Sequence, residues 1–179
     1  MPNRKLLAKI GYMAQTDALY STLTARENLK FFGAMQGISN DALKKQIPYA
    51  AGIVNLNDDL DKYVKDYSGG MKRRLSLAIA LVSDPELLIL DEPTVGIDPE
   101  LRQQIWAELN KIAKQGKTIL LTTHVMEDAE QSDQLMMIRN GVAIAQGTPD
   151  QLIKDFQVNT VEEVFLKAGR QQDENSRND

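Results

Sequence analysis

The chain has 179 residues, a length that fits one domain at about 150 residues per domain. Its composition is 42% hydrophobic and 26% charged, which excludes disordered, collagen-like and low-complexity proteins. The absence of cysteine excludes a disulfide framework and a thiolate metal site, and the net charge of −4 argues against nonspecific binding to nucleic acid.

The first half predicts one strand followed by helices. Residues 5–15 include an apolar stretch that is typical of a strand. Thr24 and Glu27 form a T-x-x-E capping box, which predicts the start of a helix. A second helix from about Asp41 is expected to be kinked or interrupted by Pro48, because proline lacks a backbone N–H.

The second half alternates strands and helices. Its expected elements are a strand over 86–91 buried on both faces, a helix from Pro99 to Gly116, a strand over 117–124, a hairpin around Asn140-Gly141, and helices beginning near Thr148 and Thr160. Residues 171–179 are polar and are expected to form a disordered tail. This alternation predicts an α/β fold with a mostly parallel sheet.

Two acids end the strand LLILD. Asp91 falls at the carboxyl end of the strand, where open α/β sheets bind ligands, and can hold Mg²⁺ through a water. Glu92 points differently and can activate a water as a general base. The alternative is an ordinary solvated strand end.

A glycine-rich turn precedes the helix MKRRLSLAIALV. Ser68 is a helix N-cap, and Gly69 and Gly70 expose backbone N–H groups at the positive end of the helix dipole, which suits an anion. The basic residues 72–74 stand where the dipole disfavours positive charge, so we expect an anionic partner to offset that cost. The alternative is a plain serine-capped loop.

His124 is the single histidine and follows the strand ILLTT. If that strand runs parallel to LLILD, His124 lies at the same sheet edge as Asp91. The alternative is a structural or merely exposed histidine.

The order of these motifs resembles the nucleotide-binding domain of ATP-binding cassette (ABC) proteins. The motifs are, in order, Gln15 after a strand, SGGM, LLILDEP, VGIDP and TTH. The resemblance covers about residues 5–168, and it implies an ATP-binding and ATP-hydrolysing domain that uses Mg²⁺.

The resemblance also assigns roles to residues on the N-terminal side. Gln15, in IGYMAQ, looks like the Q-loop glutamine, which contacts Mg²⁺ and its water and links to the membrane domain. Ser68, Gly69 and Gly70 look like the family signature, which binds the γ-phosphate of ATP held by the opposite subunit.

Four more residues match family motifs in the second half. Asp91 looks like the Walker B aspartate, and Glu92 looks like the catalytic base. Asp98 looks like the D-loop aspartate that communicates across the dimer. His124 looks like the switch histidine that senses the γ-phosphate. Together these roles match the needs of phosphoryl transfer: a cation, an oriented water and donors around the developing charge.

The sequence departs from the family at the P-loop, G-x-x-x-x-G-K-[ST]. Gly116-Lys117-Thr118 is the single Gly-Lys-Thr tripeptide, but Lys111 stands where the first glycine belongs, and the tripeptide joins a helix to a strand. We therefore expect the N-terminal part of the domain to be missing, and the isolated chain to bind ATP poorly and hydrolyse it negligibly. Uncovered sheet surface should make the chain associate with itself or with a partner, or fold incompletely.

The expected fold is an incomplete P-loop NTPase-type α/β sheet with flanking helices and an inserted helical signature subdomain. The expected parts are a remnant of the N-terminal core over 1–16, a helical subdomain over 17–82, a RecA-like core over 83–170 and the tail over 171–179.

The expected function is that of the ATP-binding subunit of an exporter-type ABC transporter, whose ATP-driven dimerisation is coupled to transport. Its partners would be a second nucleotide-binding domain and a transmembrane permease, with no nucleic acid. The short apolar runs and the lack of an export signal predict a cytoplasmic location, peripheral on the inner face of the membrane.

Two alternatives stay open. One is a non-transport ABC ATPase; the 53 positions from Gln15 to Ser68 exclude the long coiled-coil insertion of chromosome-type members, while translation-type members usually carry two cassettes. The other is a non-catalytic interaction fragment.

Overall fold

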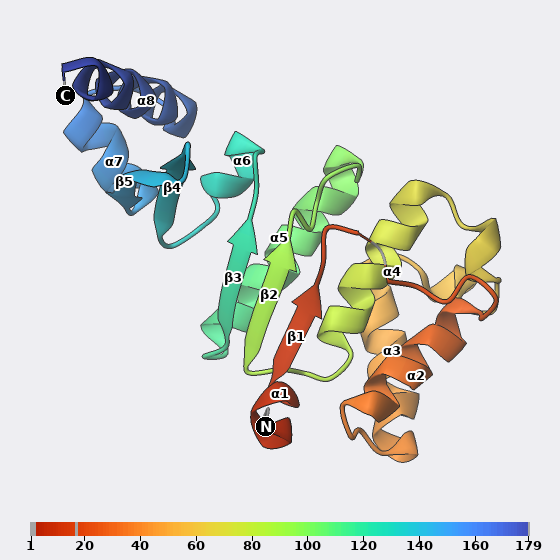
Figure 1. The fold of residues 1–179 in the computed structure, drawn as a ribbon. Helices are drawn as coiled ribbons and strands as arrows, with labels where there is room; N and C mark the ends of the chain where they lie inside the picture. The colour runs from red at the N-terminus through yellow and green to blue at the C-terminus, as the bar shows by residue number, and fades with distance from the viewer. Residues whose placement is uncertain (1–2, 17, 179) are drawn as a thin grey trace. The chain divides into compact units, whose positions relative to one another are not determined.

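The computed structural model describes residues 3–16 and 18–178 and divides the chain into two compact units, Met1–Thr122 and Thr123–Asp179. The first unit carries a parallel sheet and most of the helices, and the second carries a hairpin and the C-terminal helices (Figure 1).

The sheet of the first unit has three strands in the order β1-β2-β3. They are β1 (Ile10–Met13), β2 (Leu87–Asp91) and β3 (Thr118–Thr122), and both neighbouring pairs are parallel. The predicted α/β fold with a parallel sheet is confirmed. The strand expected over 5–15 is shorter, because α1 (Arg4–Leu7) forms a helical turn before it.

The two faces of this sheet differ in burial. Met13, Leu88 and Leu90 are nearly fully buried on one face, under helices α4 (Gly69–Leu81) and α5 (Pro99–Lys114). The other face is more open, and Tyr12 and Leu120 are both 60% exposed there. The expectation that residues 86–91 are buried on both faces was therefore wrong, because β2 alternates between buried and half-buried residues.

Helices beside the sheet complete the first unit. Helices α2 (Ala25–Met35) and α3 (Asn40–Ile53) pack against each other and against α4. Two 3₁₀ turns, Asn57–Asp59 and Val64–Asp66, follow them.

Two sequence predictions concern the start of α2 and the proline inside α3. The Thr24–Glu27 capping box is present at the start of α2, as predicted. Helix α3, however, runs through Pro48 without interruption. The buried residues Leu43 and Ile47 lie on the same helical face, and their packing outweighs the single hydrogen bond that Pro48 cannot donate.

The second unit consists of α6 (Met126–Ala129), the antiparallel hairpin of β4 (Leu135–Arg139) and β5 (Val142–Gly147), α7 (Pro149–Phe156) and α8 (Val161–Asn178). The predicted hairpin is confirmed, and Asn140 and Gly141 both adopt the positive φ that its turn requires.

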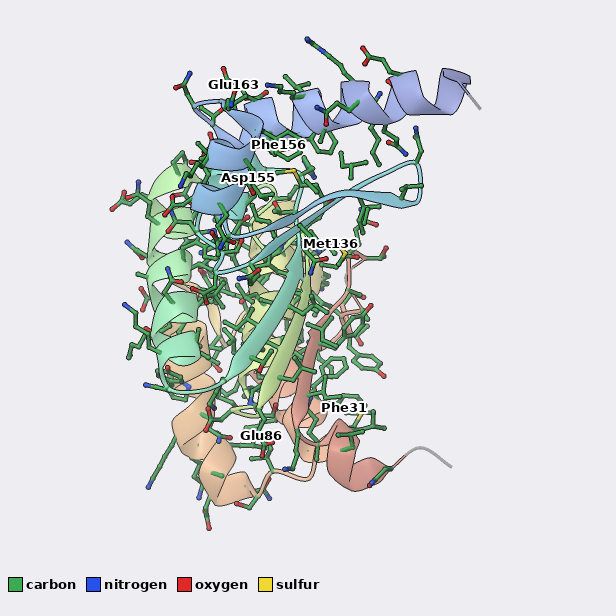
Figure 2. All side chains as sticks on the ribbon, turned by 90° about the vertical axis from the view of Figure 1, so that its left-hand side faces the viewer. Phe31, Glu86, Met136, Asp155, Phe156 and Glu163 are labelled. Atoms are coloured by element: carbon green, nitrogen blue, oxygen red, sulfur yellow. The ribbon has the colours of Figure 1, made fainter. Side chains whose placement is uncertain are left out.

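Helix α8 is longer than the sequence suggested. Val161 and Val164 anchor it in a small core that also includes Phe156, labelled in Figure 2. Residues 171–178, expected as a disordered tail, continue the helix instead. Asp173 forms an ion pair with Arg139 of the hairpin at 2.9 Å, which gives this polar stretch a partner.

Candidate nucleotide site

The carboxyl ends of the sheet strands meet at one edge. Gln15 follows β1 by two residues, and β2 ends on Asp91. Asp91 stands opposite Thr122 in the register, and the Thr122 hydroxyl donates a hydrogen bond to Oδ1 of Asp91. A half-buried carboxylate is thus held at this edge, as the sequence predicted.

Glu92 leaves the strand in a left-handed backbone conformation. Its φ is +51°, a region that non-glycine residues adopt at an energetic cost. Its N–H donates to the Thr122 carbonyl oxygen at 3.0 Å, so the turn is tied to β3.

The glycine-rich turn begins α4. The Ser68 Oγ accepts from the Met71 N–H at 3.2 Å, so Ser68 is the N-cap, and Gly69 and Gly70 form the first helical turn. Tyr67, just before the cap, is buried and donates its hydroxyl to the Asp59 carbonyl oxygen at 2.7 Å. Burial raises the pKa of Tyr67 to about 12, so this tether stays protonated at neutral pH.

A contact that sequence reasoning missed joins the helix to the sheet edge. Arg73 is 9% exposed and donates to the carbonyl oxygens of Ala14 at 3.0 Å, Gln15 at 2.8 Å and Glu92 at 2.7 Å, and also to that of Asp91. We expected an anionic partner to offset the charge of residues 72–74, and for Arg73 the structure supplies the negative ends of four backbone carbonyl dipoles. The run of three basic residues was the only signal of this contact.

Arg74 makes a similar contact elsewhere. Its Nη1 donates to the carbonyl oxygens of Val54 at 3.1 Å and Asn55 at 2.8 Å, at the end of α3. Consecutive arginines therefore serve different purposes: Arg73 joins α4 to the sheet edge, and Arg74 joins α4 to α3.

A side-chain hydrogen bond also joins α3 to helix α5. The Tyr49 hydroxyl donates to Glu108 Oε1 at 2.5 Å. This hydrogen bond raises the pKa of Tyr49 to about 12. Burial alone would raise the pKa of Glu108, but hydrogen bonds from Tyr49 and Lys111 outweigh it and lower that pKa.

A hollow of about 470 Å³ lies between the glycine-rich turn and the loop before α5. Its lining includes Ser68, Gly70, Met71, Gly96 and Asp98. The two loops approach closely, since a Cβ on Gly70 would lie 3.4 Å from the Gly96 carbonyl oxygen.

Asp98 has a structural task besides the one that the family resemblance implies. It is the N-cap of α5, and its carboxylate accepts from the Leu101 N–H at 3.0 Å. We expect Asp98→Ala to lower the free energy of unfolding by about 1 kcal/mol. Asp98→Asn should keep most of the stability that the cap provides, because asparagine also caps helices. Urea unfolding followed by the fluorescence of Trp106, the single tryptophan, measures both. Equal losses in the two variants would contradict a capping role.

His124 follows β3 by two residues and belongs to the second unit, where it is exposed. The structure therefore brings Gln15, Asp91 and Glu92 to one sheet edge in the first unit, with Ser68–Gly70 and Asp98 around the hollow, while His124 stands in the other unit.

The Gly116-Lys117-Thr118 tripeptide holds no phosphate-binding loop. Gly116 has a φ of +89° and follows the end of α5, and Lys117 forms an ion pair with Asp84 and donates to its carbonyl oxygen at 3.1 Å. The structure agrees with the prediction that this tripeptide joins a helix to a strand.

Within residues 3–16 and 18–178, no three His, Asp or Glu side chains gather as a metal site, and no helix has the length and apolar character to cross a membrane. Mg²⁺ commonly uses one or two carboxylates and keeps several waters, so the single carboxylate of Asp91 suits its donor needs.

An α/β sheet with acids and a glycine-rich helix start near its carboxyl edge is typical of nucleotide-binding folds. The chain matches the model of the ABC transporter family over residues 2–95 and belongs to that family. It is 48% identical over 159 residues to Nod factor export ATP-binding protein I of Neorhizobium galegae, covering 87% of this chain and 46% of the relative.

Other comparisons agree. A relative of the same name from Rhizobium meliloti is 48% identical, with 87% of this chain and 47% of the relative covered. The chain spans about half the length of these curated relatives. The solved ATP-binding subunit of an ABC transporter superposes with a TM-score of 0.84 at 27% identity, covering 93% of this chain and 70% of that one. A dimeric ATP-binding cassette bound to ADP and Pi shares the fold, with a TM-score of 0.74 at 23% identity over 83% of this chain and 68% of that one.

Proposed function

We propose that this chain is part of the ATP-binding and ATP-hydrolysing subunit of an exporter-type ABC transporter. The observation that carries the proposal is the meeting of Gln15, Asp91 and Glu92 at the carboxyl edge of one parallel sheet. The relatives described above are export ATP-binding proteins, which favours export over a non-transport role.

Each residue takes a role in phosphoryl transfer. Glu92 accepts a proton from the attacking water, and Gln15 orients that water. Asp91 and Gln15 would hold Mg²⁺, which when bound neutralises charge on the phosphates. The fixed carboxylate of Asp91, held by Thr122, reduces the reorganisation that binding requires.

The remaining residues have roles that require the assembled transporter. Ser68, Gly69 and Gly70 donate to the γ-phosphate of ATP held by a second nucleotide-binding domain, Asp98 communicates between the two domains, and His124 senses the γ-phosphate. Ser68 and Gly69 are exposed at the start of α4, and a Cβ on Gly69 would meet nothing within 4 Å, which supports the first of these roles.

The subunit works at a membrane without entering it. We propose that residues 17–82 form a helical subdomain that contacts a transmembrane permease near Gln15, that 83–170 form the RecA-like core, and that 1–16 belong to the N-terminal core. The protein would lie peripherally on the inner face of the cell membrane, and ATP-driven dimerisation would be coupled to transport.

The printed sequence holds no P-loop motif, so we propose that these 179 residues alone bind ATP weakly and hydrolyse it negligibly. A calorimetric titration of the 179-residue chain with ATP and Mg²⁺ is expected to give little heat. Tight binding would contradict this part of the proposal.

The catalytic role is tested in the product of the complete reading frame that carries this chain. Glu92→Gln removes the base while keeping the size of the side chain, so ATP hydrolysis is expected to fall by about 10²–10⁴-fold. Binding of ATP should persist. A coupled phosphate-release assay measures the rate, and equilibrium dialysis measures the binding.

Glu86→Gln provides the matched control. Glu86, labelled in Figure 2, precedes the opposite end of β2 and forms an exposed ion pair with Lys9 at 2.8 Å. Its loss should leave hydrolysis nearly unchanged. If both variants lose activity equally, or if the unsubstituted protein hydrolyses no ATP, Glu92 is not the base and a non-catalytic role is favoured.

A further inference from the structure

One buried side chain touches both segments that carry the proposed chemistry. The Arg73 Nη1 donates to the carbonyl oxygens of Ala14 and Gln15, and its Nη2 donates to those of Asp91 and Glu92. The two segments are separated by more than 70 residues in sequence, yet they share a single guanidinium.

The geometry demands arginine. A guanidinium presents five N–H donors in a rigid planar fork, so one group can serve carbonyls that lie on two sides of it. A lysine ammonium has three donors on one atom and cannot reach both pairs at once. Arg73 is 9% exposed, so water is poorly placed to replace these bonds.

The backbone that Arg73 contacts is also the backbone that needs support. Glu92 has a φ of +51°. Its N–H donates to Thr122 at 3.0 Å, and its carbonyl accepts from Arg73 at 2.7 Å and, within the turn itself, from the Val95 N–H at 3.3 Å. A strained conformation persists where its surroundings over-determine it. Loss of the Arg73 bond removes the shortest of these three hydrogen bonds and the one whose donor is charged.

We propose that Arg73 is a positioning residue that fixes the backbone of Glu92 and of Gln15 relative to each other. A movement of α4 then reaches the proposed base and the proposed water-orienting glutamine through one side chain. This inference rests on the proposed function for the roles of Glu92 and Gln15, while the structural coupling that it describes can be measured without nucleotide.

Two residue pairs allow the contact to be observed directly in the 179-residue chain. Glu92-Pro93 is the single Glu-Pro pair in the sequence, and Gln15-Thr16 is the single Gln-Thr pair. Selective ¹³C-carbonyl and ¹⁵N labelling of these residue types therefore isolates the carbonyl resonances of Glu92 and Gln15, with carbon detection for the proline pair.

In Arg73→Gln, both carbonyl resonances are expected to move upfield, because each loses a charged donor. Amide exchange at Glu92 should accelerate by about tenfold, since its restraint is weakened. Arg73→Lys should restore one carbonyl resonance and leave the other displaced. Arg74→Gln is the matched control, because Arg74 donates to Val54 and Asn55 instead, and it should leave both resonances in place.

The proposal is overturned if folded Arg73→Gln leaves both resonances unmoved, or if Arg74→Gln displaces them equally. Should Arg73→Gln not fold, Arg73→Lys decides the question, because two unmoved resonances in that variant would also overturn it. Failure of the Glu92→Gln hydrolysis test would remove the catalytic meaning of the contact but would not change these resonances, so the two failures are distinguishable.

Discussion

Gly11→Ala is expected to lower the free energy of unfolding of the first unit by about 3 kcal/mol or more. A Cβ at this position would lie 2.1 Å from the carbonyl oxygen of Ala80 in α4, and 2.9 Å from side-chain atoms of Leu88 and Pro85. The nearest atom is backbone, so the helix itself must move away from β1. That movement would open the core on which α4 packs.

Urea unfolding followed by Trp106 fluorescence measures this loss, because Trp106 lies in α5 of the same unit and is 8% exposed. Gly52→Ala is the matched control. Its added Cβ would approach only the Asn57 side chain, at 3.3 Å, and alanine favours a helix over glycine. We expect the control to keep its unfolding midpoint, and an equally unaffected Gly11→Ala would refute the close contact of α4 with β1.

The open face of the sheet is expected to make the 179-residue chain associate with itself. Tyr12, Ile89 and Leu120 stand side by side in the register across β1, β2 and β3, and Tyr12 and Leu120 are each 60% exposed. Burying such a row of apolar side chains between two copies is favourable at about 25 cal/mol per Å² of apolar surface. The weight-average mass should therefore exceed that of one chain and rise with concentration.

Sedimentation equilibrium measures the mass, and Leu120→Lys should return it toward the 20.0 kDa of one chain. A lysine in the middle of this row would place a charge in the contact. Met35→Lys is the control, because Met35 is 71% exposed but belongs to helix α2 rather than to the sheet. A monomeric unsubstituted chain, or an equal effect of Met35→Lys, would count against association through the sheet.

Local patterns predicted most of the fold. The capping box at Thr24, the helix start at Thr148 and the Asn140-Gly141 turn depend on neighbouring residues alone, and all three are present. Burial was harder to predict, because the apolar run of β2 gives no sign that one face of its sheet is open. Pro48 predicted an interrupted helix, and the polar residues after Gln171 predicted disorder. Both segments are helical, because packing against distant residues outweighs their local preference for non-helical structure.

The sequence indicated the candidate site better than it indicated the contacts that hold the site. Asp91, Glu92 and Ser68 stand at strand and helix ends, and those ends are readable from periodicity. Arg73 was read as part of a basic run, because its four carbonyl partners come from segments far away along the chain. No local pattern encodes such a contact.

The glycine-rich turn provides a way to separate folding from recognition. A Cβ on Gly69 would meet nothing within 4 Å, and no positive φ demands glycine there. The fold of the chain therefore places no steric limit on this position, in contrast to Gly11. If a library of substitutions at position 69 yields stable but inactive proteins, the constraint comes from a molecule outside the chain, and the tolerated sizes at that position would report how closely that molecule approaches.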